Sequence, residues 1–168
     1  MKTTATLTVL LVCTMACRAA PTAKPVQADA PLQIPYGAPQ AEVARQLGLP
    51  GEAAPTVGGC RYWKPAGLPT GLRLMIADGK VVRGDIDSGT VRTPEGAGIG
   101  STEAEVGKLY PGLVSQPHKY RSAEGWHYLI ARAPADSALR YVFETDGHAV
   151  TTYRAGIEPF VEYVEGCG

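Results

Sequence analysis

The chain has 168 residues, 45% of them hydrophobic, and its 16 Lys and Arg residues balance its 16 Asp and Glu residues. This length and composition are typical of one globular domain. A formal net charge of zero provides no basic surface of the kind that binds a phosphate backbone, which argues against nucleic acid as a partner. The 20 glycines and 14 prolines, against 7% aromatic residues, indicate short elements joined by many turns.

The first 16 residues have the features of an export signal. Lys2 gives a positive start, and residues 5–12 form an apolar stretch too short to span a bilayer as a helix. Residues 14–16 end in a small side chain suited to cleavage. The sequence therefore predicts a signal peptide over residues 1–16 and a mature protein outside the cytoplasm.

The residue after the predicted cleavage site is Cys17. The run Thr-Met-Ala-Cys at 14–17 resembles the bacterial lipobox, whose cysteine is lipidated. This resemblance implies a lipoprotein anchored by Cys17, and Arg18, in place of the Asp that retains lipoproteins at the inner membrane, implies an outer-membrane lipoprotein facing the periplasm. Cleavage without lipidation, giving a soluble periplasmic or secreted protein, is the alternative. Residues 17–35 are rich in Ala and Pro and predict a tether.

Two cysteines remain in the predicted domain once Cys13 leaves with the signal and Cys17 carries the lipid. An even pair in an oxidising compartment predicts a disulfide between Cys60 and Cys167. Closing such a long loop would stabilise the fold by about 4–5 kcal/mol in the chain-entropy model. Two distant cysteines are too few ligands for a zinc ion, and we predict neither a metal site nor a cofactor.

One short motif occurs twice in the chain. The pattern Gly-x-(Pro/Thr)-x-x-Glu-Val is found at residues 37–43 and 100–106. Each copy predicts the start of a short helix, because Thr102 and Glu105 suit a capping box and Pro39 suits a first turn, where an amide hydrogen is not required.

Strands are predicted after each helix. Aromatic segments lie at 60–63 and 126–130, and Asp-Gly pairs lie at 78–79 and 146–147 between β-rich segments. Asp-Gly indicates a hairpin because these residues accept the positive φ of a tight turn. Alternate residues of the strands before these turns share one face: Leu72, Leu74, Ile76, Leu139, Tyr141 and Phe143. We expect that face to pack against the helices.

The predicted fold class is α+β, with two tandem helix-plus-antiparallel-β-meander repeats packed as one domain over residues 36–168. The first repeat covers about 36–93 and the second about 94–168. Either repeat alone would bury little apolar surface, so we expect the two to pack side by side.

This arrangement resembles known families. The helix-opening motif, the aromatic strand and the Asp-Gly hairpin are similar to the small envelope-lipoprotein domain of the outer-membrane assembly type (SmpA/OmlA) and to the tandem β-lactamase-inhibitor-protein (BLIP-like) fold. The resemblance implies a non-catalytic protein that binds an envelope or secreted protein through an aromatic sheet face, either as an envelope assembly accessory or as an enzyme inhibitor. Large aromatic side chains would anchor such an interface.

Polar and aromatic residues are densest at 117–128. Their types also suit acid–base catalysis, but the sequence shows no positioned partner and no nucleophile motif, so we predict that the protein is not an enzyme. The alternative is that the rings belong to the core. The predicted binding residues are Tyr62, Trp63, His118, Tyr120, Trp126, His127 and Tyr128.

A carbohydrate-binding module is the second function that these residues allow. Trp and Tyr rings stack on sugars, and His118 with acidic neighbours would supply hydrogen bonds. A broad aromatic sheet face would favour a protein partner, whereas a narrow groove holding one or two coplanar rings would favour a glycan.

Overall fold

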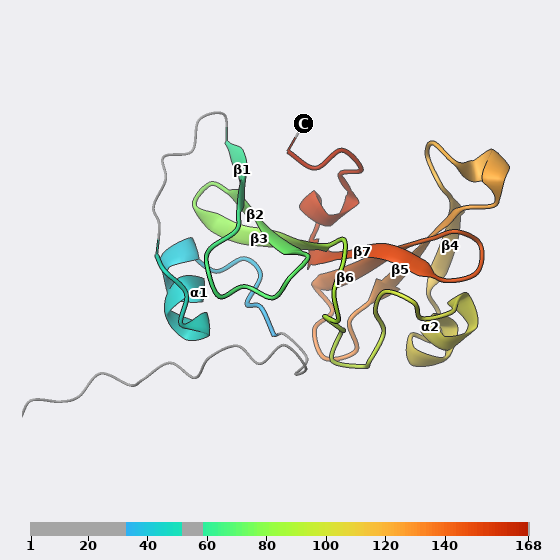
Figure 1. Cartoon of the computed structure of the whole chain (residues 1–168), viewed down its shortest axis with the longest axis horizontal. Helices are drawn as coiled ribbons and strands as arrows, with labels where there is room; N and C mark the ends of the chain where they lie inside the picture. Colours follow the sequence, from blue (N-terminus) through green and yellow to red (C-terminus); the bar gives the residue numbers. More distant parts are fainter. Residues whose placement is uncertain (1–32, 52–58, 168) are drawn as a thin grey trace, which may run out of the picture.

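A computed structural model describes residues 33–51 and 59–167 of the chain. Its centre is a seven-stranded sheet in the order β1-β2-β3-β7-β6-β5-β4 (Figure 1), and every pair of neighbouring strands is antiparallel. The strands are β1 (Cys60–Trp63), β2 (Leu72–Ala77), β3 (Lys80–Ile86), β4 (Val114–Pro117), β5 (His127–Arg132), β6 (Leu139–Thr145) and β7 (Val150–Ile157). The helical segments are α1 (Gln40–Leu47), α2 (Glu103–Leu109) and the 3₁₀ turns η1 (Ser122–Glu124) and η2 (Phe160–Glu162). The predicted α+β class is confirmed.

The predicted signal peptide, the lipidation of Cys17 and most of the predicted tether lie outside the described residues. Within the part of the chain that the structure describes, no helix is long and apolar enough to cross a membrane.

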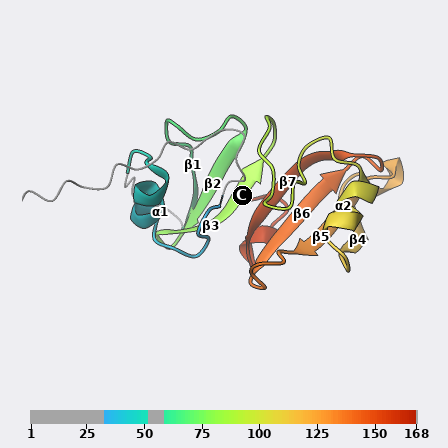
Figure 2. The ribbon, with the colours of Figure 1, turned by 90° about the horizontal axis from the view of Figure 1, so that it is seen from below.

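The helices begin where the repeated motif predicts. In α2 the Thr102 hydroxyl accepts a hydrogen bond from the Glu105 amide (3.2 Å), and the Glu105 carboxylate accepts one from the Thr102 amide (2.8 Å). This is the predicted capping box. Pro39 precedes α1, and Gly48 ends it with a φ of 64°, a conformation that glycine adopts without strain. The two helices lie on the same face of the sheet, α1 at the β1 end and α2 at the β4 end (Figure 2).

The glycine that opens each copy of the helix motif makes the same backbone hydrogen bond to a hairpin. The Gly37 amide donates to the Val81 carbonyl (2.7 Å), and the Gly100 amide donates to the Val150 carbonyl (2.9 Å). Gly37 and Gly100 open the two copies of the motif, and Val81 and Val150 lie at the start of the strands that return from the two hairpins. The two halves of the chain therefore share one local contact pattern.

The two halves join through β3 and β7, which pair at the centre of the sheet, with Arg83 opposite Gly156 and Gly84 opposite Ala155. The backbones approach closely here. A Cβ atom on Gly156 would lie 2.5 Å from the Val82 carbonyl oxygen, so this position of the join requires a residue without a side chain.

The two Asp-Gly segments form different turns. Asp78-Gly79 joins β2 to β3 directly, with φ values of 47° and 73°, as the sequence predicts. The β6–β7 connection is longer, because β7 begins only at Val150. Here the Asp146 carboxylate accepts hydrogen bonds from the His148 and Ala149 amides (3.0 and 2.9 Å). The bonds from Ala149 and His148 lower the pKa of Asp146.

The main hydrophobic core lies between the sheet and the two helices. The residues predicted to share the inner face all belong to it or pack against it: Leu72, Leu74, Ile76, Leu139, Tyr141 and Phe143. Val43 and Val106, which end the two copies of the motif, are fully buried in the same core. Burial of each such aliphatic side chain contributes roughly 1.5–3 kcal/mol.

The central strands of the opposite face, β3, β7 and β6, are covered by the C-terminal segment, residues 158–167, which lies above the middle of the sheet in Figure 1. Val161 of this segment is fully buried. The Arg83 guanidinium donates to the Phe160 carbonyl (3.0 Å), and the Arg154 guanidinium donates to the Val161 carbonyl (2.6 Å). Arginine side chains of the sheet therefore donate hydrogen bonds to backbone carbonyls of the segment that covers them.

The predicted disulfide is confirmed. Cys60 at the start of β1 is bonded to Cys167, with their Cα atoms 5.6 Å apart. It attaches the end of the C-terminal segment to the edge strand of the sheet and closes a loop across 107 sequence positions.

Candidate functional site

The structure distributes the seven predicted binding residues among separate regions. Trp63 is only 4% exposed and belongs to the main core, so it is withdrawn from the predicted binding residues. Tyr62, its neighbour in β1, points to the opposite face, where a Cβ atom on Gly166 would lie 2.3 Å from the Tyr62 hydroxyl. Tyr62 thus contacts the C-terminal segment and is half-buried by it.

His127 also lies apart from the others. Its side chain is on the face that carries α2, and its Nδ1 is 3.1 Å from the Glu103 carboxylate, which also accepts a hydrogen bond from Thr145. Burial alone would raise the pKa of Glu103. The hydrogen bonds from Thr145 and His127 lower it by more, so the net shift is downward. His127 therefore attaches β5 to α2.

The remaining four residues gather around the β4–β5 loop, residues 118–126. The loop closes on itself, because the His118 amide donates to the Trp126 carbonyl (3.0 Å) and Gly125 adopts a φ of 81° after η1. We call the side chains of His118, Tyr120, Arg121, Trp126 and Tyr128 the loop cluster.

His118 is the centre of the loop cluster and is only 7% exposed. Its Nδ1 accepts hydrogen bonds from the amides of Tyr120 (3.1 Å) and Arg121 (3.2 Å). Because Nδ1 accepts two hydrogen bonds, the proton of the neutral ring is on Nε2. Nε2 lies 3.4 Å from the Glu144 carboxylate. Both ring nitrogens are therefore engaged, and His118 positions the loop backbone.

Rings and a guanidinium pack around His118. The Tyr128 ring stacks on it at a centroid distance of 4.5 Å, and the Trp126 ring meets it edge-on at 5.8 Å. The Arg121 guanidinium lies 3.5 Å from the centroid of the Trp126 ring and is held there by Glu124 (2.6 Å). Such contacts contribute about 0.5–1.5 kcal/mol each, so they stabilise the conformation of the loop.

Tyr120 points outward from this base and is 59% exposed. Its hydroxyl and the Lys119 ammonium both bond to Glu165 of the C-terminal segment, the ammonium at 3.2 Å. The hydrogen bonds from Tyr120 and Lys119 lower the pKa of Glu165. The loop is therefore fastened to the C-terminal segment while the Tyr120 ring remains accessible.

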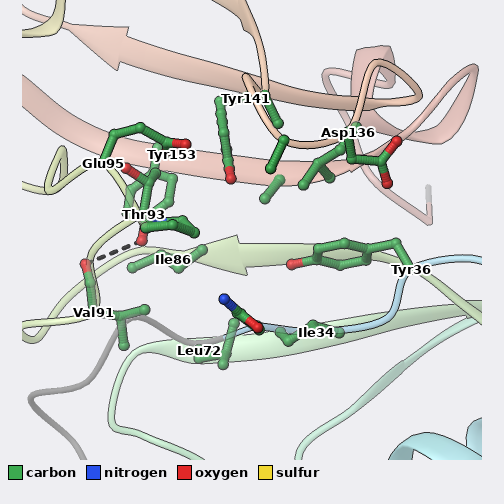
Figure 3. A pocket seen from close by; sticks show the side chains of 16 residues that line it. Ile34, Tyr36, Leu72, Ile86, Val91, Thr93, Glu95, Asp136, Tyr141 and Tyr153 are labelled. Carbon is green, nitrogen blue, oxygen red and sulfur yellow. Dashed lines mark hydrogen bonds between the residues drawn. The ribbon is translucent and has the colours of Figure 1, made fainter. Parts of the chain in front are cut away.

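A pocket that the sequence did not indicate lies on the other face of the sheet, between the two halves (Figure 3). Its volume is about 290 Å³. Gly84 and Ala155 face each other across β3 and β7 at the base of this region, and the Tyr36 hydroxyl lies 2.6 Å from where a Cβ atom of Gly84 would be. The absence of a side chain at Gly84 thus leaves room for the Tyr36 hydroxyl at this side of the pocket.

Three tyrosines line this pocket. The Tyr153 hydroxyl donates to the Val91 carbonyl (3.0 Å). Among the described residues, the hydroxyls of Tyr36 and Tyr141 have no hydrogen-bond partner, although Tyr141 is only 3% exposed. Burial raises the pKa of all three phenols, so they remain protonated hydrogen-bond donors.

Among residues 33–51 and 59–167, no group of three or more His, Cys, Asp or Glu side chains is arranged to hold a metal ion. The accessible chemistry of the loop cluster is that of an aromatic and cationic surface, and that of the pocket is an apolar cavity with phenol hydroxyls.

No protein-family model and no curated protein matches this chain. Among solved structures, the chain is similar to an extracellular protein containing an SCP domain from Bacillus anthracis str. Ames, with a TM-score of 0.46 and 13% sequence identity. The match covers 86% of this chain and 50% of that chain, so this chain spans about half the length of the solved one.

Proposed function

We propose that this protein is a non-catalytic secreted or envelope protein that binds a protein partner through the β4–β5 loop. The observation that carries the proposal is Tyr120, 59% exposed on a loop whose backbone is held by the buried His118 ring. Tyr, Trp and Arg are the residue types that contribute most at protein interfaces, and a loop that is already ordered loses little entropy on binding.

Both ring nitrogens of His118 already have partners, which supports a non-catalytic role. Its Nδ1 accepts two backbone amides and its Nε2 faces Glu144, so neither nitrogen is available to remove a proton from a substrate. The partner would be an assembly complex of the envelope or an enzyme that the protein inhibits.

The loop cluster favours a protein partner over a glycan. A sugar ring stacks on an exposed aromatic face, but Tyr128 is buried beneath His118 and one face of Trp126 is covered by Arg121. Tyr120 is the ring of the cluster that is largely exposed. A single projecting tyrosine flanked by Lys119 and Arg121 suits a pocket on a protein surface.

The same proposal includes a duplicated unit. Residues 36–93 and 94–168 would be two copies of one helix-plus-meander repeat, as in the SmpA/OmlA-like and BLIP-like folds. It is supported by the matching bonds of Gly37 to Val81 and of Gly100 to Val150, and by the pairing of β3 with β7, the last strand of each half.

The proposed location rests on the cysteines and the leader. The Cys60–Cys167 disulfide supports an oxidising compartment, because such bonds persist outside the cytoplasm. Lipidation of Cys17 and an outer-membrane location facing the periplasm complete the proposal, with a soluble secreted protein as the form without the lipid. Replacement of Cys17 by Ser, followed by membrane fractionation, separates the two.

Binding through the loop is tested by truncating Tyr120. Proteins captured from the envelope and culture fractions with the full-length protein are identified, and their affinities are measured for the wild type, Tyr120→Ala and Tyr163→Ala. Tyr163 is 44% exposed but lies outside the loop cluster, so it is the matched control. We expect Tyr120→Ala to weaken binding by about 2 kcal/mol, roughly 30-fold. A folded Tyr120→Ala protein with wild-type affinity would refute the proposal.

A further inference from the structure

The pocket on the helix face is built at the junction of the two halves. α1 and α2 cover the outer parts of the sheet (Figure 2), and the pocket lies between them over β3 and β7. It is remote from the loop cluster, because Tyr128 and its neighbours lie on the opposite face. Binding in this pocket would therefore be independent of binding through the loop cluster.

The walls of the pocket are apolar: Ile34, Leu72, Ile86, Val91, Ala133 and Leu139. A volume of about 290 Å³ is near the lower end of the range for small-molecule sites, which begins at about 300 Å³. Walls of this kind suit the ring or short chain of a small molecule.

Unpartnered hydroxyls point into the pocket. Figure 3 shows Tyr141 projecting from its strand into the cavity, with Tyr36 entering from the other side. Neither hydroxyl has a hydrogen-bond partner among the described residues, and Tyr141 is only 3% exposed. Both hydroxyls line the open space of the pocket and have no protein partner there, so each can donate a hydrogen bond to a polar atom of a ligand.

The charges along the pocket have one sign. Its lining contains Glu95 and Asp136 and no Lys or Arg, and Figure 3 shows these two carboxylates on either side of Tyr141. Hydrogen bonds hold both in place, since Glu95 accepts from the Tyr110 hydroxyl (2.6 Å) and Asp136 accepts from the Ala138 amide (2.9 Å). Such a lining attracts a cation and repels an anion.

We infer that this pocket binds a small hydroxylated amine, with its apolar body against the walls, its hydroxyl oxygen bonded to Tyr36 and Tyr141, and its ammonium group near Asp136, while Glu95 on the other side adds to the negative potential. The apolar walls, the unpartnered phenols and the two carboxylates each account for one part of that ligand.

The test uses three probes of one shape and different charge. Tyramine is a cation, tyrosol is neutral and 4-hydroxyphenylacetate is an anion, and all three carry the same hydroxylated ring. Isothermal titration calorimetry with the full-length protein measures the three affinities. We expect tyramine to bind more tightly than tyrosol by roughly tenfold, the effect typical of a hydrogen bond to a charged group, and 4-hydroxyphenylacetate to bind most weakly. Failure of all three to bind, or equal binding of the cation and the anion, would overturn the inference.

Two variants assign the binding to this pocket. Asp136→Asn should reduce the preference for tyramine over tyrosol, whereas Glu42→Gln, an equal change of charge on the exposed side of α1, should leave it unchanged. Tyr141→Phe keeps the ring in the core and removes the hydroxyl. It should therefore weaken the binding of tyramine more than the binding of phenethylamine, which lacks the ring hydroxyl. Unchanged probe affinities in both pocket variants, with unchanged melting temperatures, would show that the amine binds elsewhere.

Discussion

The two faces of the sheet are built in different ways. The face under α1 and α2 is apolar, and its core uses residues whose two-residue period can be read along each strand. The other face carries buried charges, and its central strands are covered by the end of the chain. An apolar face needs only a helix to exclude water, whereas a charged face requires partners for each buried group. The second face therefore depends on contacts between residues far apart in sequence.

Buried ion pairs link the centre of the second face to the loop cluster. Arg83 pairs with Asp85 in β3, Arg154 pairs with Glu144 (2.5 Å), and Glu144 also faces His118 (3.4 Å). Burial lowers the pKa of the Arg154 guanidinium, and Arg83 adds to this effect. The loop that we propose for binding is thus coupled to the covered face, while the pocket belongs to the apolar one.

The largest expected effect on stability comes from the disulfide. The double variant Cys60→Ser with Cys167→Ser removes the bond that attaches the C-terminal segment to β1. Its loss should lower the free energy of unfolding by about 4–5 kcal/mol in the chain-entropy model. Urea denaturation of the variant and the wild type measures the difference. A change below about 1 kcal/mol would mean that the sheet contacts alone hold the segment in place.

A buried arginine gives the next largest effect. Arg83→Ala leaves Asp85 buried without its partner and removes the donor to the Phe160 carbonyl, which should cost about 3–5 kcal/mol of unfolding free energy.

Arg73→Ala is the matched control on the same face. Its ion pair with Asp87 (3.3 Å) is partly exposed, so its loss should cost less than about 1 kcal/mol. Equal losses in the two variants, measured by chemical denaturation, would contradict the view that the second face depends on buried charges.

The local features of this fold were predictable from the sequence. The capping box of Thr102 and Glu105, the Asp78-Gly79 turn and the α+β class each depend on residues close together in the chain. The disulfide was predictable because the cysteine count left one pair. The opposite directions of Tyr62 and Trp63 also follow from strand alternation, although which of the two faces is the core does not.

The pocket, the burial of His118 and the covering of the second face depend on contacts between segments that are distant in sequence. The pocket is lined by residues of both halves, such as Ile86 and Tyr141, which are brought together by the pairing of β3 with β7, a register that neither half specifies alone. The burial of His118 requires the loop to fold back on β5, and the covering of the second face requires Val161 to reach the sheet. No periodicity in the sequence indicates these three contacts.

The smallest expected effect is a pH-dependent change at the loop. The folded-state pKa of Glu165 is lowered by its hydrogen bonds from Tyr120 and Lys119. A lowered pKa means that the contact contributes fully above the ordinary carboxyl pKa, about 4.3, and is lost as the pH falls through the folded-state value. NMR signals of the Tyr120 ring should therefore shift in acid. In Glu165→Gln this step should be absent, and its persistence would assign the titration to another group.

Site-specific photo-crosslinking tests the central claim most directly. The photoreactive residue p-benzoylphenylalanine is placed at Tyr120, and at Gln46 on the exposed side of α1 as the control, in the full-length protein expressed in its native host. The account predicts a discrete crosslinked protein adduct from position 120 and none from position 46. The same adducts from both positions, or adducts from position 46 alone, would contradict binding through the β4–β5 loop.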